Sequence, residues 1–108
     1  MAISLDVDRM RSAVRASRLE WQRHALERMM ERDIRRSDAL GVLLSGEPIE
    51  DYPDDQPFSS ALFLGWIKTR PIHVVAAFDA ANERAFVITV YEPDLEHFEP
   101  DFRTRRRS

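Results

Sequence analysis

The hydrophobic residues recur with a helical period in the first part of the chain and with a strand period in the second. Residues 5–44 contain one glycine and no proline, and their apolar positions lie three or four residues apart, as on one face of a helix. This pattern predicts an amphipathic segment that is capped by Ser4 or Asp6, and a second segment over residues 21–32. Whether the two form one long helix or break near residues 17–19 is open.

A third, shorter helix is predicted from Ser37, a favourable N-cap, to Leu44, with Gly46 just past its end. After Gly46 the hydrophobic period changes to two, which is typical of strands. Four such segments, separated by turn residues, cover residues 47–52, 58–67, 72–78 and 85–91. Helices followed by a meander of strands predict an α+β fold, in which N-terminal helices pack on an antiparallel sheet of about four strands.

The last two predicted strands also allow a prediction of their register. If the more apolar residues of both strands share one face of the sheet, Phe78 lies opposite Phe86. His73 then lies opposite Tyr91 on the other face. A bulge near the turn would shift this register.

Composition excludes several classes of protein. The 108 residues correspond to one domain, and 44% hydrophobic and 32% charged residues are ordinary for a globular chain. The absence of cysteine excludes disulfides, thiolate zinc sites and a cysteine nucleophile. The three glycines form no phosphate-binding loop, and no apolar run approaches the roughly 20 residues of a membrane helix. Because no signal peptide opens the chain, we expect a cytoplasmic protein that does not bind membranes.

The formal net charge of −3 hides a division of charge along the chain. Residues 1–36 carry +3, residues 37–102 carry −10, and residues 103–108 hold four arginines and no acid. A basic front and tail around an acidic middle can bind phosphate at one surface and a basic partner at another. All but one of the basic residues are arginines, which suits phosphate contacts, although a GC-rich genome produces the same bias.

His24, Arg28 and Arg32 lie four residues apart on one edge of the second predicted helix. An imidazole beside two guanidinium groups suits phosphodiester cleavage, because histidine exchanges protons near neutral pH and arginine neutralises charge at phosphorus. The alternative is a solvated helix face, on which neighbouring glutamates pair with these bases.

His73 and Tyr91 form the second candidate site, since the predicted register brings a proton-transfer group next to a phenol. The alternative is that aromatic residues favour strands and that His73 is a hydrogen-bonded polar residue beneath a helix. The three histidines are far apart in sequence and show no zinc-ligand spacing. We therefore predict neither a metal nor a cofactor, and we interpret the acidic stretch after Tyr91 as a solvated edge.

Four ordered segments carry a resemblance to a known family. They are HALERMMER at residues 24–32, GEPIEDYPDD at 46–55, RPIHVV at 70–75 and ITVYEPD at 88–94. The chain resembles a small bacterial and archaeal domain family of unknown function, which is grouped with the RelE and BrnT toxins and often encoded beside zinc-finger antitoxin-like proteins. The resemblance covers about residues 21–106.

The resemblance implies a RelE-like α+β domain over residues 21–102, after a helical extension at residues 1–20 and before a basic, disordered tail at residues 103–108. It implies a toxin that cleaves RNA through the ribose 2′-hydroxyl and that is held by an antitoxin protein of zinc-finger type. In the mechanism that this suggests, the catalytic residues are His24, His73, Tyr91 and Arg28, and the substrate-binding residues are Arg32 and Arg70.

A function of a different class is a non-catalytic protein-interaction module, a degenerate toxin-like domain that acts with a partner protein or as a homodimer. The amphipathic N-terminal segment favours a homodimer, because its apolar face needs a surface on its own chain or on a twin. A basic patch that joins His24, His73 and Tyr91 would favour the enzyme. An exposed apolar groove, with the histidines buried apart, would favour the module.

Overall fold

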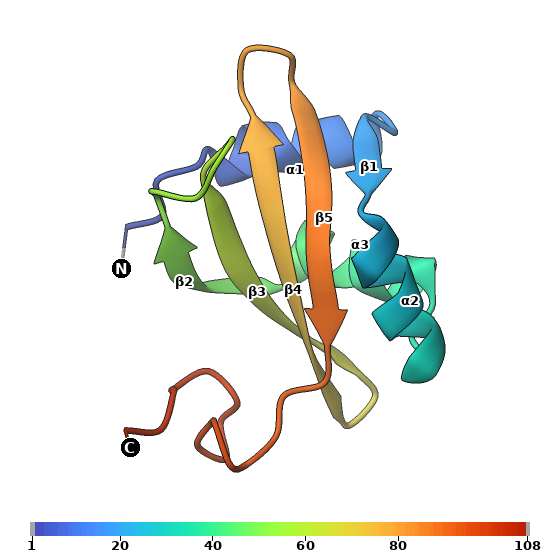
Figure 1. Cartoon of the computed structure of the whole chain (residues 1–108), viewed down its shortest axis with the longest axis vertical. Helices are drawn as coiled ribbons and strands as arrows, with labels where there is room; N and C mark the ends of the chain where they lie inside the picture. Colours follow the sequence, from blue (N-terminus) through green and yellow to red (C-terminus); the bar gives the residue numbers. More distant parts are fainter. Residues whose placement is uncertain (1, 108) are drawn as a thin grey trace.

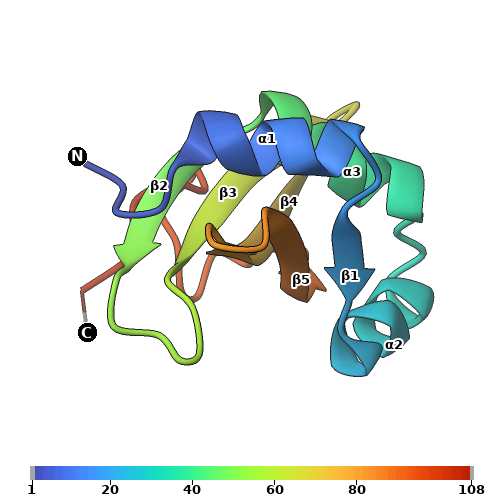
Figure 2. The ribbon, with the colours of Figure 1, turned by 90° about the horizontal axis from the view of Figure 1, so that it is seen from above.

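The strands form a single twisted sheet, and helices cover one of its faces (Figures 1 and 2). The computed structural model describes residues 2–107; Met1 and Ser108, the ends of the predicted extension and tail, lie outside the described residues. In chain order, the elements are α1 (Val7–Arg15), β1 (Leu19–Trp21), α2 (Arg23–Glu31), α3 (Arg36–Ser45), β2 (Glu47–Tyr52), β3 (Ser60–Ile67), β4 (Arg70–Asp79) and β5 (Arg84–Tyr91). The strand order is β1-β5-β4-β3-β2, in which β1 is parallel to β5 and the other neighbours are antiparallel.

The α+β class is confirmed, but the helices do not form one N-terminal block and the sheet is larger than predicted. After α1 ends, Ser17 adopts a left-handed backbone with a φ of 61°, a conformation that glycine more often supplies at helix ends. The chain then turns into β1, which pairs with β5. The sheet therefore has five strands in place of about four, and it is mixed in place of antiparallel.

Side-chain caps explain where two of the helices begin. The carboxylate of Asp6 accepts a hydrogen bond of 3.1 Å from the backbone N–H of Arg9, so Asp6 is the cap of α1. The cap predicted at Ser37 is wrong, because Ser37 lies inside α3. There the carboxylate of Asp38 accepts a hydrogen bond of 2.9 Å from the N–H of Arg35, the residue before the helix.

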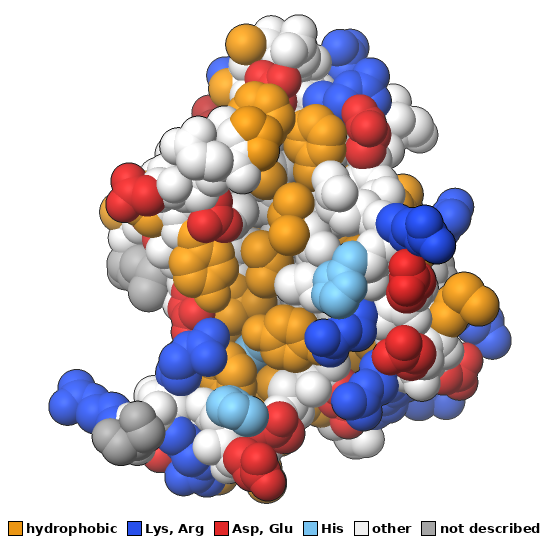
Figure 3. All heavy atoms as spheres, in the orientation of Figure 1, with side chains coloured by type: hydrophobic (Ala, Val, Ile, Leu, Met, Phe, Trp, Pro, Cys, Tyr) orange, Lys and Arg blue, Asp and Glu red, His pale blue; other side chains and the backbone are white. Residues whose placement is uncertain are grey.

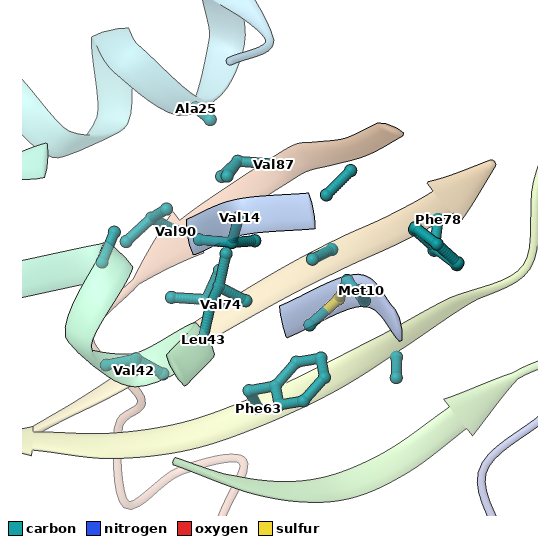
Figure 4. Packing of buried hydrophobic residues seen from close by; sticks show 14 of the residues in the cluster. Met10, Val14, Ala25, Val42, Leu43, Phe63, Val74, Phe78, Val87 and Val90 are labelled. Atoms are coloured by element: carbon teal, nitrogen blue, oxygen red, sulfur yellow. The ribbon is translucent and has the colours of Figure 1, made fainter. Parts of the chain in front are cut away.

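The main hydrophobic core lies between the helices and the sheet (Figure 4). Met10 and Val14 of α1 and Leu43 of α3 pack with Phe63 and Val74 of the strands, and all five side chains are buried. The apolar face of α1 is therefore covered by its own chain and does not need a second copy to cover it. The homodimer itself stays a prediction.

The end of the chain covers part of the opposite face of the sheet. Among the described residues no helix or strand follows β5, and residues 94–107, which we call the C-terminal strap, pack there through Phe98 and Phe102. Their apolar neighbours on the sheet include Leu62 and Leu64. One isolated bridge between Phe98 and Arg105 folds the strap back on itself.

The hairpin of β4 and β5 contains a bulge. His73 lies opposite Tyr91, which confirms that part of the predicted register, but Ile88 has no partner on β4. The register therefore changes by one residue at Ile88, and the predicted pair of Phe78 with Phe86 is wrong.

The bulge also changes which residues of β5 face the helices. Ala85 and Val87 enter the main core in place of Phe86. Phe86 instead stacks on Phe58, with ring centroids 5.5 Å apart. In the part of the chain that the structure describes, no helix has the length and apolar character to cross a membrane.

Candidate functional site

His73 lies under the strap, with a side chain that is 0% exposed. Its Nδ1 lies 3.2 Å from the hydroxyl of Tyr91, and its Nε2 lies 2.7 Å from the backbone carbonyl oxygen of Phe102. Because a carbonyl oxygen only accepts hydrogen bonds, Nε2 carries a proton; Nδ1 then accepts from the Tyr91 hydroxyl when the ring is neutral. The register of β4 and β5 thus brings together the two sheet residues that the sequence predicts.

Glu50 and Tyr52 of β2 and Arg105 of the strap extend this pair. The guanidinium of Arg105 binds the carboxylate of Glu50 through two contacts of 3.0 and 3.2 Å, the bidentate geometry that arginine also adopts on phosphate. The hydroxyl of Tyr52 donates to the same carboxylate at 2.5 Å. The charges of Glu50 and Arg105 both act on His73. We call Glu50, Tyr52, His73, Tyr91 and Arg105 the polar cluster.

The protonation states of the polar cluster follow from burial and hydrogen bonds. Burial lowers the pKa of His73 below its ordinary 6.5, more than the hydrogen bond to the Phe102 carbonyl raises it. Burial raises the pKa of Glu50, but hydrogen bonds from Arg105 and Tyr52 outweigh this effect and hold that pKa below the ordinary 4.5. At neutral pH the cluster therefore combines a neutral imidazole with a carboxylate and a guanidinium.

The two phenols of the cluster stay protonated. Burial raises the pKa of Tyr91, although the positive charge of Arg105 lowers it in part. Burial and the neighbouring carboxylate of Glu50 both raise the pKa of Tyr52. Each phenol can therefore donate a hydrogen bond at neutral pH.

The strap covers the polar cluster but leaves its edge open. The ring of Phe98 stands edge-on to His73, with centroids 4.6 Å apart, and Arg105 lies over the ring of Phe98 at 4.7 Å. A pocket of 180 Å³ reaches Tyr91 and Arg105 from outside. In Figure 3, apolar side chains gather along the middle of this face and charged side chains flank them. A ligand can thus approach Tyr91 directly, but it reaches His73 only when the strap moves.

Most of the polar cluster lies in a region that a family model recognises. The model of the family described as "Domain of unknown function (DUF4258)" matches residues 21–92. The chain belongs to the DUF4258 family. No curated protein and no solved structure matches the chain significantly. The predicted membership in a small family of unknown function is therefore confirmed, whereas the match ends at residue 92 and leaves the strap outside the DUF4258 domain.

The helix residues of the predicted site are placed differently. His24, Arg28 and Arg32 are exposed on and just after α2. Arg70 donates to the carbonyl oxygen of Arg32 at 2.9 Å and pairs with Glu92 at 3.0 Å, so it ties the end of α2 to the end of β5. Among the described residues, no hydrogen bond or ion pair joins the side chains of these four predicted residues to the polar cluster.

The predicted site residues do not include Glu50, Tyr52 or Arg105. A signal for the first two exists, because Glu50 and Tyr52 are two residues apart in a predicted strand and therefore share a face. Arg105 has no comparable signal, since it is one of four arginines in a segment without periodicity.

The described residues include one group whose atoms are spaced for a metal ion, at the start of the strap. Ligand atoms of Asp94, Glu96 and His97 lie within 4.8 Å of one another, and all three side chains are exposed. The carboxylate of Asp94 already binds Nδ1 of His97 at 2.8 Å and caps the turn through backbone N–H groups. These hydrogen bonds of the turn explain why the three side chains lie close together.

Proposed function

We propose that this DUF4258 protein is a RelE-like toxin: an endoribonuclease that cleaves RNA through the ribose 2′-hydroxyl, without a metal ion, and that an antitoxin protein holds inactive. The observation that carries the proposal is the polar cluster, which combines a carboxylate, an imidazole and a guanidinium on one face of a sheet. Such cleavage requires a base, an acid and a positive charge beside the phosphate. The sheet with helices on one face is compatible with the RelE-like fold that the resemblance implies.

Each group of the cluster has a step that suits its protonation state. The carboxylate of Glu50 takes the proton of the 2′-hydroxyl, and the 2′-oxygen attacks phosphorus. The imidazolium form of His73, which becomes favourable once the strap no longer buries the ring, gives the Nε2 proton to the departing 5′-oxygen. The products are a 2′,3′-cyclic phosphate and a 5′-hydroxyl. Arg105 neutralises the phosphorane, and the hydroxyl of Tyr91 holds the Nδ1 side of the imidazole.

The helix arginines keep a role outside the chemical step in this proposal. Arg28 and Arg32 lie on and just after α2, where exposed guanidinium groups bind phosphates along an RNA strand. Arg70 holds the end of α2 in place through its bonds to Glu92 and to the carbonyl oxygen of Arg32. His24 is exposed near these arginines, so the proton-transfer role passes to His73 and Glu50.

Cleavage of RNA by purified variants tests the proposal. We expect Glu50→Gln and His73→Ala to slow cleavage by about 10²–10⁴-fold, as the loss of a general base or acid does. Glu20→Gln is the matched control for Glu50→Gln, because Glu20 lies on β1 and pairs with Arg84 outside the cluster, and its rate should equal that of the wild type. The products should carry 2′,3′-cyclic phosphates, and EDTA should leave the rates unchanged.

Circular dichroism of each variant verifies the fold, and growth on expression gives a second readout. Equal cleavage by the folded wild type, Glu50→Gln and His73→Ala would contradict the proposed site. Absence of both cleavage and growth inhibition would contradict the toxin function.

A second candidate function is a non-catalytic protein-interaction module, which an apolar groove on the strap side of the sheet favours. The groove has a volume of 140 Å³ and is lined by the stacked rings of Phe58 and Phe86 and by Ile88, which is 37% exposed. In this role His73 is a buried structural residue that anchors the strap. A homodimer in light scattering that Phe86→Ser dissociates, together with no cleavage of RNA, would favour the module.

A further inference from the structure

The strap carries its positive charge at its end, because its four arginines follow four acidic residues, Asp94, Glu96, Glu99 and Asp101. Residues 103–107 hold four arginines, whereas residues 21–92 hold eight bases against twelve acids and carry a charge of −4. In the closed arrangement Arg103 pairs with Glu47 and Arg105 pairs with Glu50, both on the sheet, whereas Arg106 pairs with Glu99 of the strap itself at 2.8 Å. The sheet face under the strap would therefore repel an RNA backbone unless the strap itself supplied the opposite charge.

Of the two ion pairs between the strap and the sheet, the pair of Arg103 with Glu47 is of an exchangeable kind, whereas Glu50, the partner of Arg105, is only 20% exposed. The side chains of Arg103 and Glu47 are 44% and 53% exposed, and exposed pairs of this kind contribute only about 0–1 kcal/mol each. A phosphate offers arginine the same bidentate partner as a carboxylate does. Replacing one anion by the other therefore changes the free energy of the arginine little, and it removes one of the contacts that hold the strap on the sheet, beside the packing of Phe98 and Phe102.

The hydrogen bond of His73 links this exchange to the polar cluster. Phe102 offers its carbonyl oxygen to Nε2 of His73, and it precedes Arg103 in the chain. When Arg103 and Arg105 leave their glutamates, the backbone between them and Phe102 moves with them. Nε2, the atom that the proposed mechanism requires, is then exposed.

From these contacts we infer that the C-terminal strap is an RNA-binding arm, whose arginines exchange the glutamates of the sheet for RNA phosphates and thereby uncover His73. The exposed Trp66, which meets Phe102 edge-on at 6.0 Å, adds an aromatic surface on which an unpaired base stacks. Stacking surfaces beside closely spaced arginines favour single-stranded RNA over an acidic protein. The exposure of His73 has a role only if the proposed function is right, whereas the binding of RNA by the strap does not depend on that function.

Binding of a short fluorescein-labelled 2′-O-methyl oligoribonucleotide to the full chain tests the arm, because this probe lacks the reactive 2′-hydroxyl. We expect Arg103→Gln to weaken binding and to lower the slope of log affinity against log salt by about 0.7, the value for one phosphate contact on a single strand. Arg15→Gln is the matched control, since Arg15 is exposed on α1 at the other face of the sheet. Equal affinities and slopes for the two variants would overturn the inference.

A substitution of Glu47, the partner of Arg103, should change the affinity for the oligonucleotide in the opposite direction. Glu47→Gln releases Arg103 and should tighten binding by about two- to fivefold, the range of an exposed ion pair. Glu20→Gln is the control of equal net charge, because Glu20 pairs with Arg84 on the β1 edge. If Glu47→Gln binds no tighter than Glu20→Gln, the arginine is not exchanged and the inference is wrong.

Hydrogen exchange reports the movement itself. The Nε2 proton of His73 lies in the contact with the carbonyl oxygen of Phe102 at 2.7 Å, and it should exchange faster when the oligonucleotide is bound, while the amides of β4 stay protected. Unchanged protection in the bound state would overturn the inference. A polyaspartate peptide of equal charge that binds as tightly would assign the arm to an acidic protein instead. If the oligonucleotide binds and opens the strap but unmodified RNA is not cleaved, the proposed function fails and the arm stands.

Discussion

The two faces of the sheet are built from alternate residues of the same strands, but different interactions cover them. On the helix side, Val74 of β4 lies in an apolar core with side chains from all three helices. On the strap side, the preceding residue along the chain, His73, meets a phenol, a backbone carbonyl and an aromatic edge. One face is closed by regular secondary structure, and the other by a strap with a single bridge.

This difference separates what holds the fold from what can be changed by solution conditions. Burial of apolar side chains is insensitive to moderate salt and to pH, whereas exposed ion pairs are screened and an imidazole titrates near neutrality. The helix side therefore maintains the sheet while the strap side opens. His73, which is buried when the strap is closed and must be reached by a substrate, lies on the strap side.

The largest expected effect is a difference in the free energy of unfolding between substitutions on the two faces. Phe63 is 0% exposed in the main core, and Phe63→Ala should lower the free energy of unfolding by about 3–5 kcal/mol. Phe98 is 2% exposed, but Phe98→Ala should cost clearly less, because the strap can detach while the sheet stays folded. Urea denaturation followed by circular dichroism measures both. Equal losses would show that the strap unfolds together with the core.

A smaller effect is expected from pH, and only on the strap side. The pKa of His73 is lower in the folded chain than its ordinary 6.5 because the ring is buried, so the closed state binds fewer protons than the open one. The stabilisation of the closed strap is then complete above pH 6.5 and is lost as the pH falls through the folded pKa. Of the groups that face His73, Tyr52, Tyr91 and Arg105 do not change charge in this range, and Glu50 acts in the same direction but at lower pH.

Hydrogen exchange of the strap amides from pH 8 to pH 5, corrected for the intrinsic rate, measures this dependence. His73→Gln should remove the dependence, and His97→Ala should leave it. A strap whose protection does not change with pH in the wild type would contradict the role of His73 as its anchor.

The smallest expected effect is that of a substitution at the start of α1, on the helix side of the sheet. Asp6→Ala removes the cap of α1 and should lower the free energy of unfolding by about 1 kcal/mol, while exchange of the strap amides should stay at the wild-type rate. A change in strap exchange on this substitution would show that the two faces are coupled through the sheet.

Local patterns predict the parts of this fold that local interactions determine. The period-two alternation of residues 72–78 and 85–91 is enough to bring His73 opposite Tyr91, because both lie on one side of the bulge. The apolar stripe of residues 5–14 and the cap at Asp6 predict α1 in the same way. These features depend on residues that are close in sequence.

The features that the sequence does not predict depend on distant partners. β1 has only three residues and is formed by pairing with Ala85, Phe86 and Val87 of β5, so its own composition carries too little signal. Ile88 is β-branched and suits a strand with or without a partner, so nothing in its type indicates a bulge. Arg105 joins the polar cluster through Glu50, 55 residues away, and no local pattern specifies that contact.

The unpaired residue at Ile88 has a consequence for how this molecule can change over evolution. It divides β5 into a half toward the turn, which carries Phe86, and a half that carries Tyr91. An insertion or deletion between the turn and Ile88 alters the facing of the first half and moves the apolar groove, whereas Tyr91 keeps its place opposite His73. The surface beside the polar cluster can thus vary in length and shape while the pairing of His73 with Tyr91 is inherited unchanged.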